Sequence, residues 1–358
     1  TSTGAPIVLS AKGAFNDKPF TASGELPPLA GLIEPERSGD VRVAVDYAGT
    51  RLVAAGKANL DLDAPRFAGW LNLASDTSSA LADAAGISAP AFGPYEFSAN
   101  VDADRKRLAA RDVELRLGKS MLRGSFSVEL GGARPHIVAT VSGRPAHLED
   151  FATQPWSLAQ LLERVTAIGG AEPQRPAPDR GTPASWHLLR AADVDLDVLM
   201  DPVFSAGAAI GRGAMKLKLD GGRLTLKPFS LSVGPGTLRA EADFDARTDI
   251  PRYAVRVEGN GFDYGPFVRA LDPASRLEGA FDLSLDLESS GASAVLDDST
   301  KGTLDLLVLP RDWRAGRLDT LGWGVLRRLM GTVDSGPESK LNCLVGSFDL
   351  AGGMMRSR

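Results

Sequence analysis

Residues 281–288 read Phe-Asp-Leu-Ser-Leu-Asp-Leu-Glu, so every second side chain is apolar and the side chains between are polar. Successive side chains of a β-strand point to opposite faces of a sheet, and this spacing therefore predicts a strand with one dry and one wet face. The same period of two recurs along the chain. It is found in residues 41–47, 95–101, 113–117 and 193–198.

The amino-acid composition favours the same fold class. Apolar residues make up 43% of the 358 residues, enough for a large core and for two domains or stacked modules. Glycine (39) and proline (23) are plentiful and aromatic residues are only 6%, which is typical of many short strands joined by tight turns. We therefore predict a mostly β fold with a few short capping helices.

Charge and cysteine content exclude several classes of protein. The chain has 40 basic and 45 acidic residues, a formal charge of -5, and no basic block long enough to follow a phosphate backbone, so we expect no nucleic-acid partner. The single cysteine, Cys343, rules out an intrachain disulfide. No apolar run reaches the roughly 18 residues needed to cross a bilayer, and residue 1 is threonine. We expect that a signal or anchor was removed or that the sequence is a fragment.

An internal repeat links two parts of the chain. Residues 108–143 recur at 224–259, 116 positions later and without gaps, and glycine and proline positions coincide as well as apolar ones. Constant spacing of this kind predicts two matching antiparallel hairpins with turns at 118–121 and 234–237. With four-residue turns, Leu117 faces Leu122 and Val233 faces Leu238.

We expect three segments. Residues 1–169 form an N-terminal β-module, which the family resemblance given below makes a β-groove module. It ends in an amphipathic helix over 157–168, where a capping box and an apolar stripe coincide. Residues 170–185 are rich in proline and lack an apolar period, which predicts an exposed linker. Residues 186–358 form a second β-module. Further short helices are predicted at 77–85, 266–271 and 319–330.

The residues that carry catalysis or bind metals elsewhere are scattered in this chain. His136, His147 and His187 lie in separate segments without the spacing of a metal site or a hydrolytic triad. The strongest metal candidate is His147 beside Glu149 and Asp150, but a solvated turn explains these residues better. The carboxylates of residues 282, 286 and 288 are expected together on a wet sheet face. We predict no metal, no cofactor and no catalytic residue, and hence not an enzyme.

Several blocks of sequence in the second half resemble those of one known family. They are residues 187–196 (His-Leu-Leu-Arg-Ala-Ala-Asp-Val-Asp-Leu), 222–229 (Gly-Arg-Leu-Thr-Leu-Lys-Pro-Phe), 236–241, 287–293, 301–306 and 341–348. In order and spacing this stretch resembles the AsmA family, which includes TamB-like relatives. At the level of architecture it is similar to the chorein-type bridge-like lipid-transfer proteins.

The resemblance implies a long, twisted antiparallel sheet folded over an apolar groove. It also implies a periplasmic protein anchored in the inner membrane by an N-terminal helix, with closing strands after the block at 341–348. We expect that both of these ends are missing from this sequence. Lipid, whether a phospholipid, a hopanoid or another terpenoid, is the expected cargo, with envelope proteins as possible partners. From the residues alone, an ordinary sandwich with a filled core explains the apolar faces about as well.

The expected groove residues are the apolar members of the alternating strands. They are Val113, Leu115, Leu117, Leu122, Phe229, Leu231, Val233, Leu238, Tyr253, Val255, Val257, Leu283 and Leu285. The function expected from them is periplasmic lipid binding or lipid transport in envelope homeostasis. The alternative is a structural or assembly factor for outer-membrane biogenesis, which has no lipid cargo and pairs with partners through an exposed strand edge.

Overall fold

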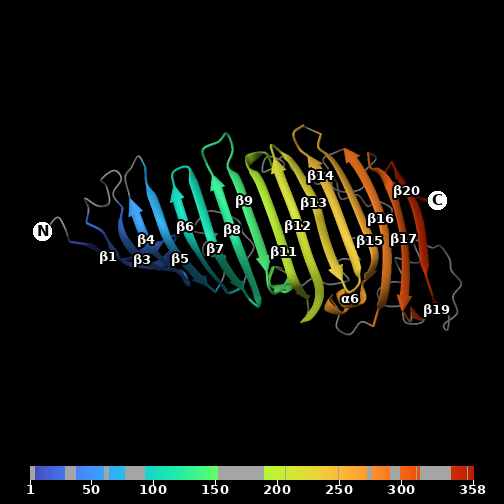
Figure 1. The fold of residues 1–358 in the computed structure, drawn as a ribbon, viewed down its shortest axis with the longest axis horizontal. Helices are drawn as coiled ribbons and strands as arrows, with labels where there is room; N and C mark the ends of the chain where they lie inside the picture. Colours follow the sequence, from blue (N-terminus) through green and yellow to red (C-terminus); the bar gives the residue numbers. More distant parts are fainter. Residues whose placement is uncertain are drawn as a thin grey trace. The chain divides into compact units, whose positions relative to one another are not determined.

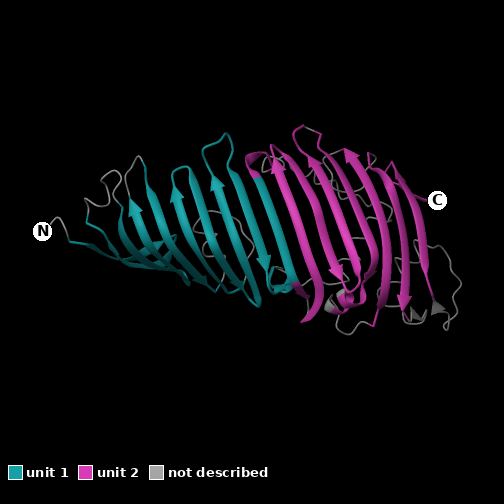
Figure 2. Cartoon of the chain, viewed as in Figure 1, with its two compact units in different colours: residues 1–153, 194–201 teal, residues 154–193, 202–358 magenta. Residues whose placement is uncertain are grey.

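The computed structural model describes most of the chain and is dominated by β-strands (Figure 1). The described residues are 5–28, 38–59, 64–76, 93–151, 189–205, 207–248, 250–271, 276–290, 299–311, 313–314, 340–352 and 354–358. The chain divides into two compact units (Figure 2). Unit 1 comprises Thr1–Thr153 and Val194–Asp201, and unit 2 comprises Gln154–Asp193 and Pro202–Arg358.

Unit 1 is an antiparallel meander in which each strand pairs with the next along the chain. Its strands are β1 (Ile7–Phe15), β2 (Lys18–Leu26), β3 (Gly39–Tyr47), β4 (Thr50–Asn59), β5 (Arg66–Ser75), β6 (Tyr95–Asp104), β7 (Arg107–Leu117), β8 (Ser120–Glu129) and β9 (His136–Gly143). The short β10 (Ala146–His147) and the single-turn helix α3 (Leu148–Phe151) follow. The unit 1 part of β11 (Asp193–Ser205) pairs with β9.

Unit 2 is a second antiparallel meander. Its strands are β12 (Ala208–Asp220), β13 (Arg223–Val233), β14 (Gly236–Asp245), β15 (Arg252–Asp263), β16 (Glu278–Ser290), β17 (Lys301–Arg311), β20 (Leu344–Ala351) and β21 (Met354–Ser357), with α6 (Gly265–Leu271) between β15 and β16. The two-residue strands β18 (Trp313–Arg314) and β19 (Lys340–Leu341) pair with each other. The predicted mostly β, open antiparallel architecture is confirmed.

The internal repeat corresponds to two equivalent hairpins. Leu115 pairs with Leu122 in β7–β8, and Leu231 pairs with Leu238 in β13–β14. Both hairpins carry a register shift at the same place, between residues 110 and 113 in the first and between 226 and 229 in the second. The predicted pair of matching hairpins is therefore confirmed, and the two hairpins also share this irregularity, which was not predicted.

The expected facing pairs within these hairpins are wrong by two residues. Each turn has two residues and not four, so Leu117 faces Ser120 and Val233 faces Gly236. The first turn residues, Gly118 and Gly234, adopt φ of 55° and 57°, a region that glycine enters without steric cost. A shift of two residues leaves every side chain on its predicted face.

The helix predicted at 266–271 is confirmed as α6. The helices predicted at 77–85, 157–168 and 319–330 and the linker predicted at 170–185 lie outside the described residues. The segment boundaries therefore stay predictions.

At one end of unit 1, α3 is attached to the β7–β8 turn. The Asp150 carboxylate accepts hydrogen bonds from the Lys119 amide (2.9 Å), the Ser120 amide (2.8 Å) and the Ser120 hydroxyl (2.6 Å). The Ser120 hydroxyl in turn accepts a bond from the His147 amide at 2.7 Å. Because the segment 147–150 is tied to the β7–β8 turn in this way, the solvated turn expected at His147 is wrong.

One end of unit 2 is closed by α6, which contacts both β12 and β16 although three strands separate them in the meander. Val268 of the helix and Phe262 just before it are buried. The hydroxyl of Tyr264 donates to the Glu278 carbonyl at 2.8 Å, and burial raises the pKa of this tyrosine above its ordinary value. Arg269 forms an ion pair with the Glu278 carboxylate and holds the helix in place.

Glycines let neighbouring strands of unit 1 approach closely. Gly56 and Gly69 face each other in β4 and β5, and a Cβ atom on Gly56 would lie 2.4 Å from the Ala68 carbonyl oxygen. A Cβ atom on Gly24 would lie 2.4 Å from the Arg42 carbonyl oxygen. Glycine inside a strand is typical of a bend or of a close approach of another backbone, and the close approach is found here.

This close approach predicts that Gly56→Val destabilises the protein by about 3 kcal/mol, because the clash is with backbone and no rotamer relieves it. Ala68→Val is the matched control, since residue 68 lies on the neighbouring strand with its side chain exposed. Thermal unfolding followed by circular dichroism measures both. Equal melting temperatures for the two variants would contradict the backbone argument.

The Asp150 cap predicts that Asp150→Ala costs about 2 kcal/mol, because it leaves the amide of Ser120 buried without an acceptor. Amide hydrogen exchange of peptides that cover residues 118–122 should accelerate. Lys119→Ala is the control, since it keeps the backbone amide that Asp150 binds and removes only an exposed side chain. Unchanged exchange in the Asp150 variant would show that the cap contributes nothing.

Candidate functional site

The strand registers place the apolar side chains of unit 2 on one face. Residues directly opposite each other in an antiparallel pair share a face, so one row can be followed from strand to strand. The row through the middle of the unit runs Met215, Phe229, Ala240, Val257, Leu285, Leu304 and Phe348, from β12 to β20. Neighbouring rows on this face are apolar as well, and together they form what we call the apolar face of unit 2.

Unit 1 has an apolar face of the same kind. Its longest row runs Ala11, Ala22, Val45, Leu52, Leu73, Phe97, Leu115, Leu122 and Gly143, from β1 to β9. No charged side chain interrupts it. The sheet of each unit therefore presents an unbroken apolar surface across its strands.

All thirteen expected groove residues lie on these two faces. Val113, Leu115, Leu117 and Leu122 belong to unit 1, and the other nine belong to unit 2. Leu117 and Val233 are buried, with 6% and 1% of their surfaces exposed, and each directly precedes a hairpin turn. The remaining eleven are half-buried. Whether they bind lipid stays a prediction.

Burial of the larger apolar side chains is concentrated at the strand ends, whereas the small Ala99 and Ala110 are also buried at mid-strand. Among the described residues, the fully buried apolar side chains larger than alanine lie within three residues of a strand end or in α6. They are Leu117, Val203, Ile210, Leu219, Val233, Phe262, Val268 and Leu350. A second sheet packed on the apolar face would bury the middle of the strands most deeply. The described part of the chain has no such layer, so the middle of each face stays half-open.

Small residues recur in the middle of the apolar face of unit 1, in a region that we call the trough. Two adjacent rows at mid-strand hold Gly24, Ala54, Ala99, Gly56, Gly69 and Ala110, which alternate there with Val41, Val43, Leu71 and Val101. On one side they border the row of Leu52, Leu73 and Phe97, and on the other side lie Phe67 and Leu108. The trough was not predicted, because the alternation of large apolar residues does not mark glycine and alanine. The sequence feature that could have predicted it is the recurrence of small residues at positions that face the apolar side.

The opposite face of each unit is polar. Cross-strand ion pairs join Arg256 to Asp286 (2.6 Å) and Arg223 to Asp243 (2.8 Å) in unit 2, and Arg116 to Glu96 (3.2 Å) in unit 1. The carboxylates of residues 282, 286 and 288 all project from this face, as expected. These exposed pairs contribute little to stability, but they keep this face wet.

Metal-binding geometry is not found among the residues that the structure describes. No group of three or more His, Cys, Asp or Glu side chains in that part of the chain could hold an ion. His136 contacts the Asp195 carboxylate at 2.9 Å, and the Asp150 carboxylate is engaged with the β7–β8 turn. His187 lies outside the described residues.

Comparison with known proteins places the chain in a family. It is 21% identical over 377 residues to the AsmA family protein YhjG of Escherichia coli (strain K12), covering 97% of this chain and 53% of that protein. The chain thus spans about half the length of this relative. No solved structure matches significantly. Within the described residues, no helix is long and apolar enough to cross a membrane.

The family model covers most of the chain. The model of the AsmA family matches residues 133–358, which include the second copy of the internal repeat and all of the strands of unit 2. This region also holds the sequence blocks on which the resemblance rested. The chain belongs to the AsmA family.

Proposed function

We propose that this protein binds lipid in the bacterial periplasm and carries or holds acyl or terpenoid chains on the apolar faces of its two units. The observation that supports the proposal is the half-open apolar face, which runs unbroken across each meander and is covered in the described part of the chain only at its ends. Membership of the AsmA family adds that the protein belongs to the cell envelope.

The dimensions of these faces suit hydrocarbon chains. At about 4.8 Å between strands, the longest apolar row of unit 1 extends about 38 Å and that of unit 2 about 29 Å. The hydrocarbon of one bilayer leaflet is about 15 Å deep, half of the roughly 30 Å core. Either face can therefore accommodate an acyl chain along its full length.

The energy of such binding comes from burial alone. Each CH₂ group removed from water contributes about 0.8 kcal/mol, so a chain of about 16 carbons buried over half of its surface gains roughly 6 kcal/mol. No hydrogen bond is needed for this gain. We therefore expect broad selectivity for the hydrocarbon part and no catalytic step.

In the whole protein we expect an inner-membrane anchor that keeps these faces in the periplasm, close to the lipid that they take up. Other envelope proteins are expected as partners that receive the lipid. The hydrocarbon faces suit phospholipid, hopanoid or another terpenoid equally well.

A structural or assembly role without cargo is the second candidate, and the edge strand β1 favours it. In the described part of the chain β1 pairs only with β2, so its other edge has free backbone groups. Val8 and Phe15 on this strand are 75% and 53% exposed. An exposed strand with apolar side chains can accept a strand from a partner.

Lipid analysis of the purified protein separates the two candidates. The full-length protein is purified from its own host, extracted with organic solvent, and the extract is analysed by mass spectrometry. Stoichiometric lipid supports binding. A protein that is free of lipid but captures a partner through β1 would favour the assembly role.

Leu285→Lys should remove most of the bound lipid from unit 2 while lowering the melting temperature only moderately. Its neighbours across the strands are Val257 and Leu304, and on a half-open face the ammonium group reaches water along its aliphatic stem. In a closed core the same change buries an unpaired charge and unfolds the unit. Bound lipid per protein and thermal unfolding are measured together.

Ser284→Lys is the matched control, because residue 284 is exposed on the polar face between Glu258 and Asp305. Ser284→Lys should change neither the bound lipid per protein nor the melting temperature. A Leu285→Lys protein that is unfolded, or one that is folded and keeps its full lipid content, would contradict a half-open lipid-binding face.

Ala54→Trp tests the trough of unit 1. The indole fills the space between Val43 and Leu71 and should lower the amount of lipid bound to this unit by at least half. Ala55→Trp places the same side chain on the other face, beside Arg42 and Trp70, and should leave lipid content unchanged. Equal lipid content in the two variants would show that the trough does not hold the chain.

A further inference from the structure

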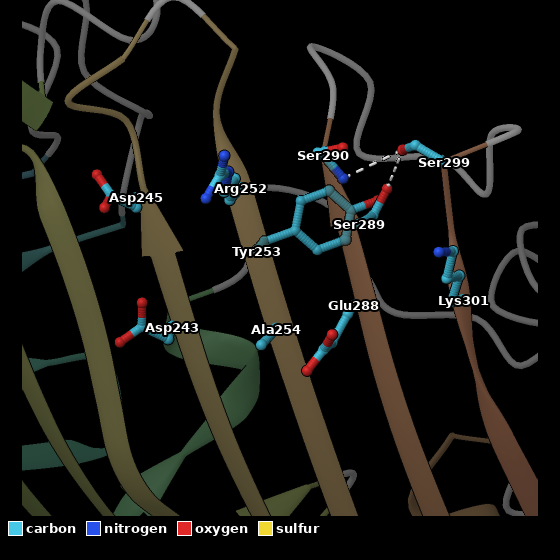
Figure 3. Close-up of a pocket in the computed structure, with 10 residues that line it drawn as sticks. All are labelled: Asp243, Asp245, Arg252, Tyr253, Ala254, Glu288, Ser289, Ser290, Ser299 and Lys301. Carbon is cyan, nitrogen blue, oxygen red and sulfur yellow. Dashed lines mark hydrogen bonds between the residues drawn. The ribbon is translucent and has the colours of Figure 1, made fainter.

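A cavity of about 390 Å³ lies in unit 2 at the end of strands β14 to β17 (Figure 3). Its volume falls in the range of small-molecule sites. Ten residues line it, and they come from both faces of the sheet. It therefore joins the apolar face to the polar face at one edge.

Two of the lining residues, Tyr253 and Ser289, come from the apolar face of unit 2. Both belong to the last row of the apolar face, where Tyr253 pairs with Phe244 and with Ser289. The rings of Tyr253 and Phe244 are stacked with centroids 6.4 Å apart. The next row inward contains Val255 and Leu287, so a chain that leaves the cavity enters the apolar face directly.

Serine hydroxyl groups belong to the lining of the cavity. The Ser289 and Ser299 hydroxyls lie 2.8 Å apart, and the Ser299 hydroxyl accepts a bond from the Ser290 amide at 3.1 Å. Figure 3 shows this group between the side chains of Arg252 and Lys301. Such hydroxyls can bind the ester and phosphate oxygens of a ligand.

The charges around the cavity fall into two classes. Asp243 is paired with Arg223 at 2.8 Å, and hydrogen bonds from Arg247 hold the pKa of Asp245 well below its ordinary value. The charges of these two carboxylates are thus already balanced by arginines of the protein. In contrast, Arg252, Lys301 and Glu288 form no ion pair or hydrogen bond with another side chain in the described ranges. The site thus offers two cations and one carboxylate to a ligand.

We propose that this cavity binds the headgroup of a zwitterionic phospholipid, an inference that rests on the lipid-binding function proposed above. The phosphate lies between Arg252 and Lys301, and the headgroup amine lies against Glu288. The acyl chains run from Tyr253 onto the apolar face. Guanidinium and ammonium groups recognise phosphate through charge-assisted hydrogen bonds, and a carboxylate does the same for a primary amine.

Unit 1 has a related cavity of about 400 Å³, in which the charged side chains are arranged differently. Tyr95 and Ser75 come from its apolar face and Arg51 from its polar face, as in unit 2. Burial raises the pKa of Tyr95. The Glu96 carboxylate, however, is paired with Arg116 at 3.2 Å and so is engaged within the protein. Selectivity for an amine-bearing headgroup is accordingly assigned to unit 2.

The test uses the full-length protein and short-chain lipids in solution, with binding measured by isothermal titration calorimetry. The probes are dihexanoyl phosphatidylethanolamine, dihexanoyl phosphatidic acid, dihexanoyl glycerol and inorganic phosphate. The double variant Arg252→Gln/Lys301→Gln should bind both phospholipids about tenfold to a hundredfold more weakly, the range expected for losing charge-assisted hydrogen bonds. Its affinity for dihexanoyl glycerol should be unchanged.

Two further variants make the result specific. Arg239→Gln/Lys218→Gln removes the same charge from the polar face of unit 2 outside the cavity and should bind every probe as the wild type does. Glu288→Gln should lose affinity for the ethanolamine lipid about tenfold and keep its affinity for phosphatidic acid. Because Glu288 is exposed, this single variant also serves if the double variant does not fold.

The outcomes separate the headgroup site from the function on which it rests. If no lipid binds the wild type, the lipid-binding function is overturned, and the headgroup site with it. If the lipids bind but the double variant retains its affinity for both phospholipids, only the headgroup site is overturned. Inorganic phosphate that binds as tightly as the phospholipids would likewise overturn it, because the cavity would then be a site for free anions.

Discussion

Cross-strand pairing sets apolar side chains opposite one another along the middle rows of each unit, and the remaining features of this molecule depend on that register. A slip of one residue between β13 and β14 would bring Ser230 or Ser232 opposite Leu238 and turn the leucines toward the ion pairs of the polar face. The two-residue glycine turns and the matching register shifts prevent such a slip, because they fix the residues at which each pairing begins and at which its register changes. Apolar face, polar face and the cavity that joins them all follow from this one constraint.

Different kinds of interaction hold the ends and the middle of each unit. The ends are held by short helices whose anchors are polar: Asp150 on the turn that precedes β8, and Tyr264 with Arg269 on Glu278. The middle has only the strands themselves within the described part of the chain, and its side chains are therefore buried by their neighbours along and across the strands. Since hydrophobic burial there is incomplete, a ligand that completed it would gain free energy without displacing any described part of the chain.

The fold class, the paired hairpins and the faces of the groove residues were predictable from sequence, because alternation and a constant repeat offset determine direction and face. The facing pairs at the turns were not predictable, since one glycine with positive φ permits either a two-residue or a longer connection. The trough was missed because alternation weighs large side chains, whereas Gly24, Gly56 and Gly69 act by having none. The cavity of unit 2 was out of reach for another reason. It combines residues 243, 252, 288 and 301, which only the register of four strands brings together.

The hairpin that recurs 116 residues apart has a consequence for how proteins of this design can vary. Duplicating one hairpin adds two strands, about 10 Å of sheet, and returns the chain to the same end with the same face inward. Deleting one subtracts the same increment. The number of strands can therefore change in evolution by whole hairpins, independently of the side chains that would meet the proposed lipid. The length of the apolar face and the strength of lipid binding would then be separate traits, each of which can change without the other.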